Sequence, residues 1–448
     1  MIERTLFKEL FKWKERKTRK PIIIRGARQV GKTTAINIFS KNFKQYIYLN
    51  LEHSEDRKLF ESGISFEDVV AAIFLSKNKD RNIETLLFID EIQNSPSAVK
   101  GLRYFYEKNP EIFVIAAGSL LETLIDKNTS FPVGRVEYLI LHPFSFIEFL
   151  QLLEEKSALD AITTFPVPNF AHDKLLSLFH KYVLIGGMPE AVSVYGRNRN
   201  FTETNRVYES LIVSYIDDVE KYSRNIMQTN VIRHIINHIF IEAGTRIKFE
   251  GFGRGPYKSR EVGEGIRILE KAMLLNLVYP FTGYSLPIIP DRKKSPRLHF
   301  LDTGLINYFS GIQTTLLLSK DISSLYKGRI IEHIVGQEIL ASTHSPLTKL
   351  HFWVKEKKQS NAEIDYLIQF ENLLIPVEVK SGATGRLRSL HQFMDNSSES
   401  FAIRLYSERA KIEQLRTIAG KNFQLLNLPY YLAGNLNNYI KSAVIDES

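Results

Sequence analysis

The sequence contains no cysteine among its 448 residues. Disulfide bonds, zinc sites with thiolate ligands and cysteine nucleophiles are therefore excluded, and the absence fits a reducing compartment. The sequence also lacks any apolar run close to the roughly 20 residues that a membrane-spanning helix needs. A protein inserted in a membrane is therefore not expected.

No secretory signal peptide is recognisable in residues 1–20. Charged residues there separate the apolar residues Phe7, Leu10, Phe11 and Trp13, whereas a signal peptide has an unbroken apolar stretch. The pattern is typical of an amphipathic helix. We expect a cytoplasmic protein.

Acidic side chains are the minority charge, with 50 Asp and Glu against 59 Lys and Arg, so the formal net charge is +9 and the pI about 9.2. This balance is compatible with a polyanionic partner, but a modest excess spread over a large surface more often serves solubility alone, so charge by itself decides nothing. The composition is otherwise that of a globular protein, with 44% apolar and 24% charged residues. A chain of this length is longer than one hydrophobic core accommodates, so about two or three domains are expected.

Short apolar runs of strand length alternate with helical patterns in the first part of the chain. The strand candidates are residues 21–24, 46–51, 86–89 and 112–116, and helical patterns cover residues 36–43 and 66–75. This alternation predicts a parallel sheet wrapped by helices. Such sheets bind ligands at the carboxyl ends of their strands, where functional residues are therefore expected.

The pattern of apolar residues in the middle of the chain predicts mostly helices. A turn at Gly186-Gly187-Met188-Pro189 interrupts the helical pattern of residues 144–222, because Gly-Gly and X-Pro both break helices. We interpret this region as a small helical lid. Residues 224–281 contain further helices and a strand-like run, which suggests a winged-helix module.

Strand patterns return near the C-terminus, at residues 351–354, 363–370 and 374–380. A helical pattern over residues 329–340 precedes them. We expect a second α/β unit here, separate from the first.

A phosphate-binding motif follows the first strand candidate. The motif residues are Gly26, Ala27, Arg28, Gln29, Val30, Gly31, Lys32, Thr33 and the adjoining Thr34. They match G-x-x-x-x-G-K-[ST] between a strand and a helix, which is the context that this motif requires. The glycines let backbone amides curl around a β-phosphate, and the helix N-terminus adds partial positive charge. Lys32 is expected to bridge the β- and γ-phosphates of ATP, and the Thr33 hydroxyl to ligate Mg²⁺.

Two carboxylates end the third strand candidate. Asp90 and Glu91 follow the apolar run at residues 86–89, which places them at the same sheet edge as the phosphate motif. Asp90 is expected to hold Mg²⁺ through water, and Glu91 to act as the base toward the attacking water. An exposed Asp-Glu pair is the alternative, but the buried strand ahead of it favours the site.

Ser119 follows the fourth strand candidate after Gly118. Its hydroxyl is a candidate sensor of the γ-phosphate. An ordinary Gly-Ser turn is the alternative, and the residues alone leave both open.

Several blocks carry a resemblance to a known family. They are RGARQVGKTT at residues 25–34, FIDEIQ at 88–93, GS at 118–119, VGRV at 133–136, HPFSFIEF at 142–149, GGMPE at 186–190 and FLDTGL at 300–305. In this order they resemble the bacterial and archaeal AAA-type ATPases in which an AAA_14 domain is followed by a DUF4143 domain. The blocks cover most of the chain.

The resemblance implies a nucleotide-hydrolysing core, a helical lid whose Gly-Gly-x-Pro turn lies near the nucleotide, and a winged-helix-like segment. It also implies a C-terminal half related to restriction-endonuclease-like folds. Arg135, in the VGRV block, is the arginine that we expect to reach a γ-phosphate, because a guanidinium neutralises charge as the bond breaks. A surface ion pair is its alternative role.

A second set of acidic residues lies near the C-terminus. Alternation along a strand places Glu378 and Lys380 on one face, and Asp365 lies on a neighbouring strand. With Glu332 on the preceding helix, the set looks like the Asp…Glu-x-Lys signature of PD-(D/E)xK nucleases, which use carboxylates and Mg²⁺ to activate water. The motif is short, and a solvated Glu-Lys pair is the alternative.

Basic residues near this set are candidates to grip a phosphate backbone. They are Arg292, Lys293, Lys294, Arg297, Lys380, Arg386 and Arg388. A solvated loop is the usual interpretation of such a charge run. DNA therefore stays a candidate partner.

The sequence predicts an α/β protein with a P-loop NTPase parallel sheet, a helical lid, a winged-helix-like segment and a C-terminal restriction-endonuclease-like α/β domain. The expected domain boundaries are residues 1–150, 151–222, 223–300 and 301–448, in the same order.

The predicted function is Mg²⁺-dependent ATP hydrolysis coupled to a nuclease-like domain that acts on or binds DNA. The alternative is a regulatory or scaffold ATPase whose C-terminal domain only binds a partner protein or nucleic acid; a small-molecule kinase is disfavoured because Glu91 is placed for water. An arginine acting on a second copy would require a homo-oligomer.

Overall fold

The computed structural model of the chain describes residues 2–61, 63–118, 132–223, 225–313, 328–355, 362–382 and 387–445. The chain forms two compact units. The N-terminal unit comprises residues 1–142, 271–274 and 343–348, and the C-terminal unit comprises residues 143–270, 275–342 and 349–448.

The N-terminal unit is built on a five-stranded sheet in the order β2-β3-β4-β1-β5, in which all neighbours are parallel. The strands are β1 (Ile22–Arg25), β2 (Gln45–Asn50), β3 (Thr85–Asp90), β4 (Phe113–Gly118) and β5 (Glu137–Ile140). Every residue of β3 and β4 is buried, as expected for central strands with both faces covered. The predicted parallel sheet is confirmed.

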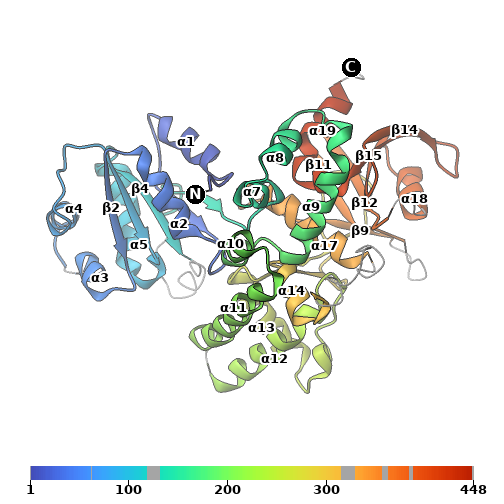
Figure 1. Cartoon of the computed structure of the whole chain (residues 1–448). Helices are drawn as coiled ribbons and strands as arrows, with labels where there is room; N and C mark the ends of the chain where they lie inside the picture. Colours follow the sequence, from blue (N-terminus) through green and yellow to red (C-terminus); the bar gives the residue numbers. More distant parts are fainter. Residues whose placement is uncertain are drawn as a thin grey trace. The chain divides into compact units, whose positions relative to one another are not determined.

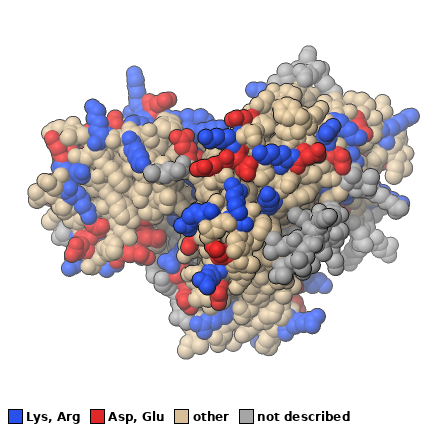
Figure 2. Space-filling view, in the orientation of Figure 1, with Lys and Arg blue, Asp and Glu red and all other residues tan. Residues whose placement is uncertain are grey.

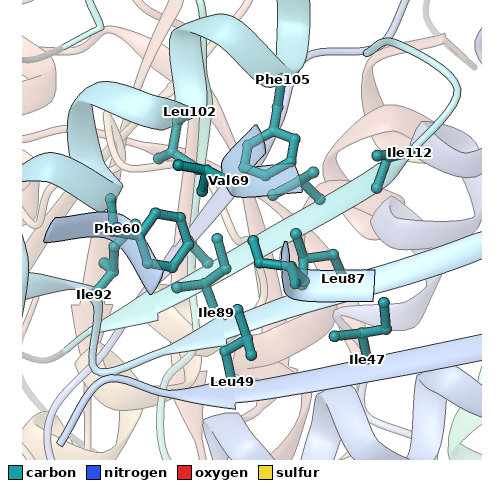
Figure 3. Close-up of a cluster of buried hydrophobic side chains, with 14 of the residues drawn as sticks. Ile47, Leu49, Phe60, Val69, Leu87, Ile89, Ile92, Leu102, Phe105 and Ile112 are labelled. Carbon is teal, nitrogen blue, oxygen red and sulfur yellow. The ribbon is translucent and has the colours of Figure 1, made fainter. Parts of the chain in front are cut away.

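Three helices cover one face of this sheet: α3 (Ser54–Glu61), α4 (Phe66–Ser76) and α5 (Pro96–Lys108). Their apolar side chains, such as Phe60, Val69 and Leu102, pack with Leu87 and Ile89 of β3 in one hydrophobic core (Figure 3). The helix starts are specified locally. Ser65 caps α4 by accepting from the Asp68 N–H, and Ser95 caps α5 just ahead of a proline.

An aromatic cluster includes residues of α1 (Phe7–Glu15) and α2 (Lys32–Phe39). The ring of Phe39 lies 5.7 Å from Phe7, and the ring of Trp13 lies 5.7 Å from Phe113 of β4. The amphipathic helix expected at the N-terminus is therefore confirmed; Phe7, Leu10 and Trp13 are buried, whereas Phe11 is exposed.

Helices dominate the C-terminal unit up to residue 341 (Figure 1). They are α7 (Phe146–Leu152), α8 (Lys156–Thr163), α9 (His172–Ile185), α10 (Pro189–Asn198), α11 (Phe201–Tyr222), α12 (Ile226–Glu242), α13 (Ser259–Lys271), α14 (Thr303–Phe309) and α17 (Arg329–Ala341). The break between α9 and α10 falls at the predicted Gly-Gly turn. Gly186 has a φ of 73°, which a residue with a Cβ rarely adopts.

The described strands of the C-terminal unit form three sheets. An antiparallel pair joins β6 (Leu275–Val278) and β8 (Arg297–Phe300), and a small sheet has the order β10-β9-β7, with β7 (Pro280–Phe281), β9 (Phe352–Val354) and β10 (Glu363–Ile364).

The largest sheet is mixed, with the order β11-β12-β13-β15-β14. Its strands are β11 (Tyr366–Phe370), β12 (Leu373–Val379), β13 (Phe401–Tyr406), β14 (Lys411–Arg416) and β15 (Asn422–Pro429); the adjoining helices are α18 (Arg388–Asn396) and α19 (Leu436–Ile445). A second α/β unit is confirmed. Its nuclease-like character stays a prediction, as do the four domain boundaries.

Among the described helices, none combines the length and the hydropathy of a membrane-spanning segment.

Candidate functional site

The phosphate motif forms the connection from β1 to α2. Gly31 is the N-cap residue of α2 with a φ of 90°, and Gln29 has a φ of 63°. A Cβ on Gly26 would lie 2.4 Å from the Leu141 carbonyl oxygen. Both motif glycines are therefore required by the backbone itself, Gly31 for its left-handed conformation and Gly26 for a close approach.

Lys32, the first residue of α2, is buried in this loop. Its ammonium group donates to the carbonyl oxygens of Gly26 and Ala27, each at 2.9 Å. Burial lowers the pKa of Lys32 to about 8, against the opposing effect of the nearby carboxylates of Glu91 and Asp90. The Lys32 ammonium group and the carboxylates of Asp90 and Glu91 are therefore close enough to interact electrostatically, as the sequence predicts.

The Thr33 hydroxyl meets the end of β3. It donates to Asp90 Oδ2 at 2.5 Å, and the Glu91 backbone N–H donates to Asp90 Oδ1 at 3.0 Å. Burial raises the pKa of Asp90, while the hydrogen bond from Thr33 opposes the rise. A hydroxyl and a carboxylate oxygen are ligands that Mg²⁺ prefers, and these two face each other. The donor set therefore fits a magnesium ion.

Tyr48 is a contact of this site that the sequence analysis missed. It lies on β2, its ring stacks on Phe88, and its hydroxyl donates to Asp90 Oδ2 at 3.3 Å. Burial, together with the charge of Asp90, raises the pKa of Tyr48 to about 12. Only the strand order could identify it, because β2 and β3 are neighbours in the sheet.

Glu91 turns away from the strand with a φ of 51° and begins a 3-10 turn, η2 (Ile92–Asn94). Its carboxylate Oε2 accepts a short hydrogen bond from the side-chain amide of Gln93.

The remaining motif residues differ in their exposure. Ala27 and Val30 are buried, Thr34 is exposed, and Arg28 lies 3.8 Å from Glu52 in an ion pair.

Arg135 lies just before β5, half-exposed. Its Nε donates to Glu107 Oε1 of α5 at 2.8 Å, which is the ion pair weighed above as its alternative role. The γ-phosphate role of Arg135 stays a prediction. Ser119 lies outside the described residues.

The four predicted nuclease residues come together in the C-terminal unit. Glu332 lies on α17, Asp365 joins β10 to β11, and Glu378 lies on β12 next to Lys380. The Lys380 ammonium lies 2.5 Å from Glu378 Oε1, and Asp365 Oδ2 accepts from the Val379 N–H at 2.8 Å. The order of the elements predicted this convergence correctly.

The carboxylates of this cluster are hard to ionise together. Burial and the charge of Asp365 raise the pKa of Glu332 to about 7 and that of Glu378 to about 8, while Lys380 opposes both shifts. Burial also raises the pKa of Asp365. The second carboxylate oxygen of Glu378, Oε2, is buried and has no hydrogen-bond partner among the described residues.

An arginine also enters this cluster. Arg297 pairs closely with Glu363, lies 3.9 Å from Asp365 Oδ1, and donates to the Asp365 carbonyl at 3.1 Å. Its side chain is only 8% exposed. The interpretation of Arg297 as a surface cation that grips a phosphate backbone is therefore wrong, because its guanidinium is buried against carboxylates.

The other predicted cations are scattered. Lys293 and Arg388 are exposed, Lys294 is half-buried, Arg292 packs on the ring of Tyr279, and Arg386 lies outside the described residues. On the face drawn in Figure 2, Lys and Arg are interspersed with Asp and Glu. The described residues contain no group of three or more His, Cys, Asp or Glu side chains arranged to hold a metal ion.

Consecutive parts of the chain match models of known protein families. The family described as an AAA domain, AAA_14, matches residues 18–150. Two domains of unknown function follow, DUF8612 over residues 176–316 and DUF4143 over residues 327–431. The middle match was not expected from the sequence analysis.

Two solved structures among those that match are only distantly similar. The Walker-type ATPase PABY2304 of Pyrococcus abyssi is 16% identical over 68% of this chain and 94% of its own, with a TM-score of 0.45. PCH-2 of C. elegans is 15% identical over 45% of this chain and 65% of its own, with a TM-score of 0.30. No curated protein matches the chain.

The phosphate loop, the paired carboxylates and the ordered family matches agree. The chain therefore contains an AAA_14 domain followed by a DUF4143 domain, in the order that the resemblance of its sequence implies.

Proposed function

We propose that the N-terminal unit hydrolyses ATP with Mg²⁺, using Thr33 and Asp90 for the metal, Lys32 for the phosphates and Glu91 as the base. The contact of the Thr33 hydroxyl with Asp90 is the observation that carries the proposal. It brings both magnesium ligands to the loop in which the Lys32 ammonium is buried.

The residues divide the reaction between them. The backbone amides of the loop and the N-terminus of α2 bind the β-phosphate, and Lys32 neutralises the γ-phosphate. Bound Mg²⁺ supplies charge neutralisation on the phosphate oxygens. Glu91 takes a proton from water as the water oxygen bonds to the γ-phosphorus and the bond to the β–γ bridging oxygen breaks, which releases ADP and phosphate.

Phosphate release and ATP calorimetry test this proposal. Lys32→Ala should abolish measurable ATP binding, whereas Glu91→Gln should keep binding and lower turnover by roughly 100-fold or more, because only the base is lost. Lys44→Ala is the matched control, since Lys44 is exposed ahead of β2. Binding that survives in Lys32→Ala, or full turnover in Glu91→Gln, would contradict the assignment.

We propose that Arg135 reaches the γ-phosphate, either within its own chain or, in a homo-oligomer, from a second copy. Mixing two inactive variants tests this. Arg135→Ala keeps an intact phosphate loop, and Lys32→Ala keeps the arginine, so the mixture should regain a fraction of wild-type turnover only if Arg135 acts between copies. No recovery together with a monomeric mass would exclude that role.

A second proposal concerns the C-terminal unit, which we infer acts on or binds DNA. It is supported by the convergence of Asp365, Glu378 and Lys380 and by the unpartnered Oε2 of Glu378. The winged-helix interpretation adds to it, since α12 and α13 are followed by the β6–β8 pair. Arg297 and the absence of a three-residue metal group in the described ranges favour the alternative, a domain that binds without cutting.

A DNA-cleavage assay with Mg²⁺ distinguishes a nuclease from a domain that only binds its partner. Cleavage that disappears in Asp365→Ala but persists in Glu408→Gln, an exposed control, supports a nuclease. Salt-dependent binding without cleavage supports the scaffold alternative. Absence of both would leave a protein partner as the ligand of this domain.

A further inference from the structure

The turn that follows β3 is rigidly held. Ile92 is fully buried and packs in the hydrophobic core beside β3 (Figure 3). The Asn94 N–H donates to the Glu91 carbonyl at 3.0 Å, and the Ser95 N–H donates to the Ile92 carbonyl at 3.1 Å. The backbone that carries Gln93 therefore has a fixed position relative to Glu91.

The side-chain amide of Gln93 is only half satisfied. Its nitrogen donates to Glu91 Oε2, whereas its oxygen Oε1 is buried and has no hydrogen-bond donor within the described part of the chain. The opposite amide orientation would face two oxygen acceptors toward each other, so Glu91 sets the orientation. A buried acceptor without a donor is destabilising, and it is kept beside the residue assigned as the base.

We propose that Gln93 is a catalytic residue that positions the attacking water together with Glu91. This inference rests on the hydrolysis proposed above. Water has two O–H groups: one gives its proton to Glu91, and the other donates a hydrogen bond to Gln93 Oε1. The oxygen lone pair is then directed at the γ-phosphorus, which is the geometry that in-line attack requires.

Gln93 changes no bond and takes no proton in this scheme. The water proton moves to Glu91, the new O–P bond forms, and the leaving group is ADP, as before. The amide nitrogen of Gln93 meanwhile holds the Glu91 carboxylate in the orientation that faces the water. A residue with this role is expected to affect turnover and not ATP binding.

A purely structural role for Gln93 predicts a different outcome. If the amide served only to fix the turn, its loss would lower the melting temperature and the ATP affinity along with the rate. The two roles are therefore distinguished by measuring all three quantities on the same variants.

The first experiment uses Gln93→Leu in the full chain. We expect kcat to fall roughly 10- to 100-fold, with the ATP affinity from calorimetry and the melting temperature close to wild type. Asn94→Ala is the matched control, because Asn94 lies on the same turn and is half-buried. Wild-type turnover in Gln93→Leu would overturn the proposal and leave the ATPase assignment intact.

The second experiment is a double-mutant cycle measured by single-turnover hydrolysis of radiolabelled ATP. In the Glu91→Gln background the water has lost its base, so adding Gln93→Leu should cost less than about twofold. An equal cost in both backgrounds would show an independent structural effect and overturn the proposal. Wild-type rates in Glu91→Gln alone would overturn both this proposal and the role of Glu91.

Discussion

The Asp302 carboxylate accepts a hydrogen bond from the backbone N–H of Gly187 at 2.6 Å, across 115 residues of sequence. The same carboxylate accepts from the N–H groups of Gly304 and Leu305, at 2.9 and 3.3 Å. One buried side chain thus joins the turn after α9 to the start of α14. Two blocks of the family resemblance, GGMPE and FLDTGL, meet at this point.

Gly187 tolerates no side chain at this junction. A Cβ there would lie 2.2 Å from the Phe144 carbonyl oxygen and 2.8 Å from its nitrogen. Gly187→Ala should therefore destabilise the C-terminal unit by about 3 kcal/mol or more, because backbone would have to move. Urea denaturation followed by Trp353 fluorescence in a Trp13→Phe background measures this, since these are the two tryptophans of the chain.

Gly382→Ala is the control for that measurement, because a Cβ at Gly382 meets no atom within 4 Å. It should shift the free energy of unfolding by less than about 0.5 kcal/mol. Equal stability of the two glycine variants would show that the turn relaxes at little cost.

ATP binding should take up a proton near pH 8. Burial lowers the pKa of Lys32 to about 8, so about half of the ammonium groups are neutral at that pH. Nearby phosphate charge favours the protonated form, and ATP affinity should therefore fall as the pH rises above about 8. Calorimetry at pH 8 in two buffers of different ionisation enthalpy counts the protons.

About half a proton per nucleotide is the expected uptake. Lys41→Ala, a change at an exposed lysine after α2, should leave the uptake unchanged. Identical heats in both buffers would contradict the lowered pKa.

Acid should weaken the C-terminal unit through a buried histidine pair. His299 and His333 stack with ring centroids 4.1 Å apart. Burial lowers the pKa of His299 to about 4, below the value of about 6.5 in an unfolded chain. The unfolded state binds more protons between these values, so the stability contributed by His299 is lost as the pH falls from about 6.5 toward about 4.

His299→Phe keeps a ring and removes the titration. Between pH 6.5 and 4.5 the variant should lose roughly 2 kcal/mol less stability than wild type, in the same Trp353 assay. The comparison with wild type is needed because burial raises the pKa of Asp302 to about 6 and that of Glu338 to about 7, and these groups favour the folded state on acidification. Parallel pH profiles would refute the prediction.

The side chain of Lys421 binds carbonyl groups at and just after the C-terminus of α18. Its ammonium group donates to the carbonyl oxygens of Met394, Ser397 and Glu399 at 3.1, 2.5 and 2.7 Å. Lys421→Met keeps the aliphatic stem and removes these donors, so it should destabilise the C-terminal unit by about 1–3 kcal/mol. Amide hydrogen exchange after α18 should also speed up.

The exposed Lys411, which pairs with Glu413 on β14, provides the comparison. Lys411→Met should cost less than about 1 kcal/mol, since exposed ion pairs contribute little. A similar loss in both variants would argue that Lys421 acts only by its charge.

The strands and the loop that were predicted correctly are those specified by short, continuous segments of sequence. Strands β1, β3 and β4 were found from sequence because burial on both faces requires continuous apolar runs. Strand β2 was found from the apolar run at residues 46–49, although its burial alternates along the strand. The phosphate loop was found because Gly31 and Gly26 are needed by the backbone. Strand β5 was missed because it is only four residues long, although three of them, Tyr138, Leu139 and Ile140, are apolar.

Other features depended on partners that are distant in sequence. β14 was missed because its residues are largely exposed and it forms only when paired to β15. Tyr48 looked like an ordinary strand residue until the strand order placed it beside Asp90. Arg297 looked like a surface cation because its acidic partner Glu363 is 66 residues away.

The sequence by itself determined the triphosphate site, because that chemistry depends on a continuous loop and on carboxylates at a strand end, which are local patterns. Tertiary structure alone decided how charges are shared, namely that Glu107 holds Arg135, that Arg297 enters the acidic cluster, and that Gln93 keeps one acceptor unpaired. Pairing and burial set the state of such groups, and both depend on residues that only folding brings together.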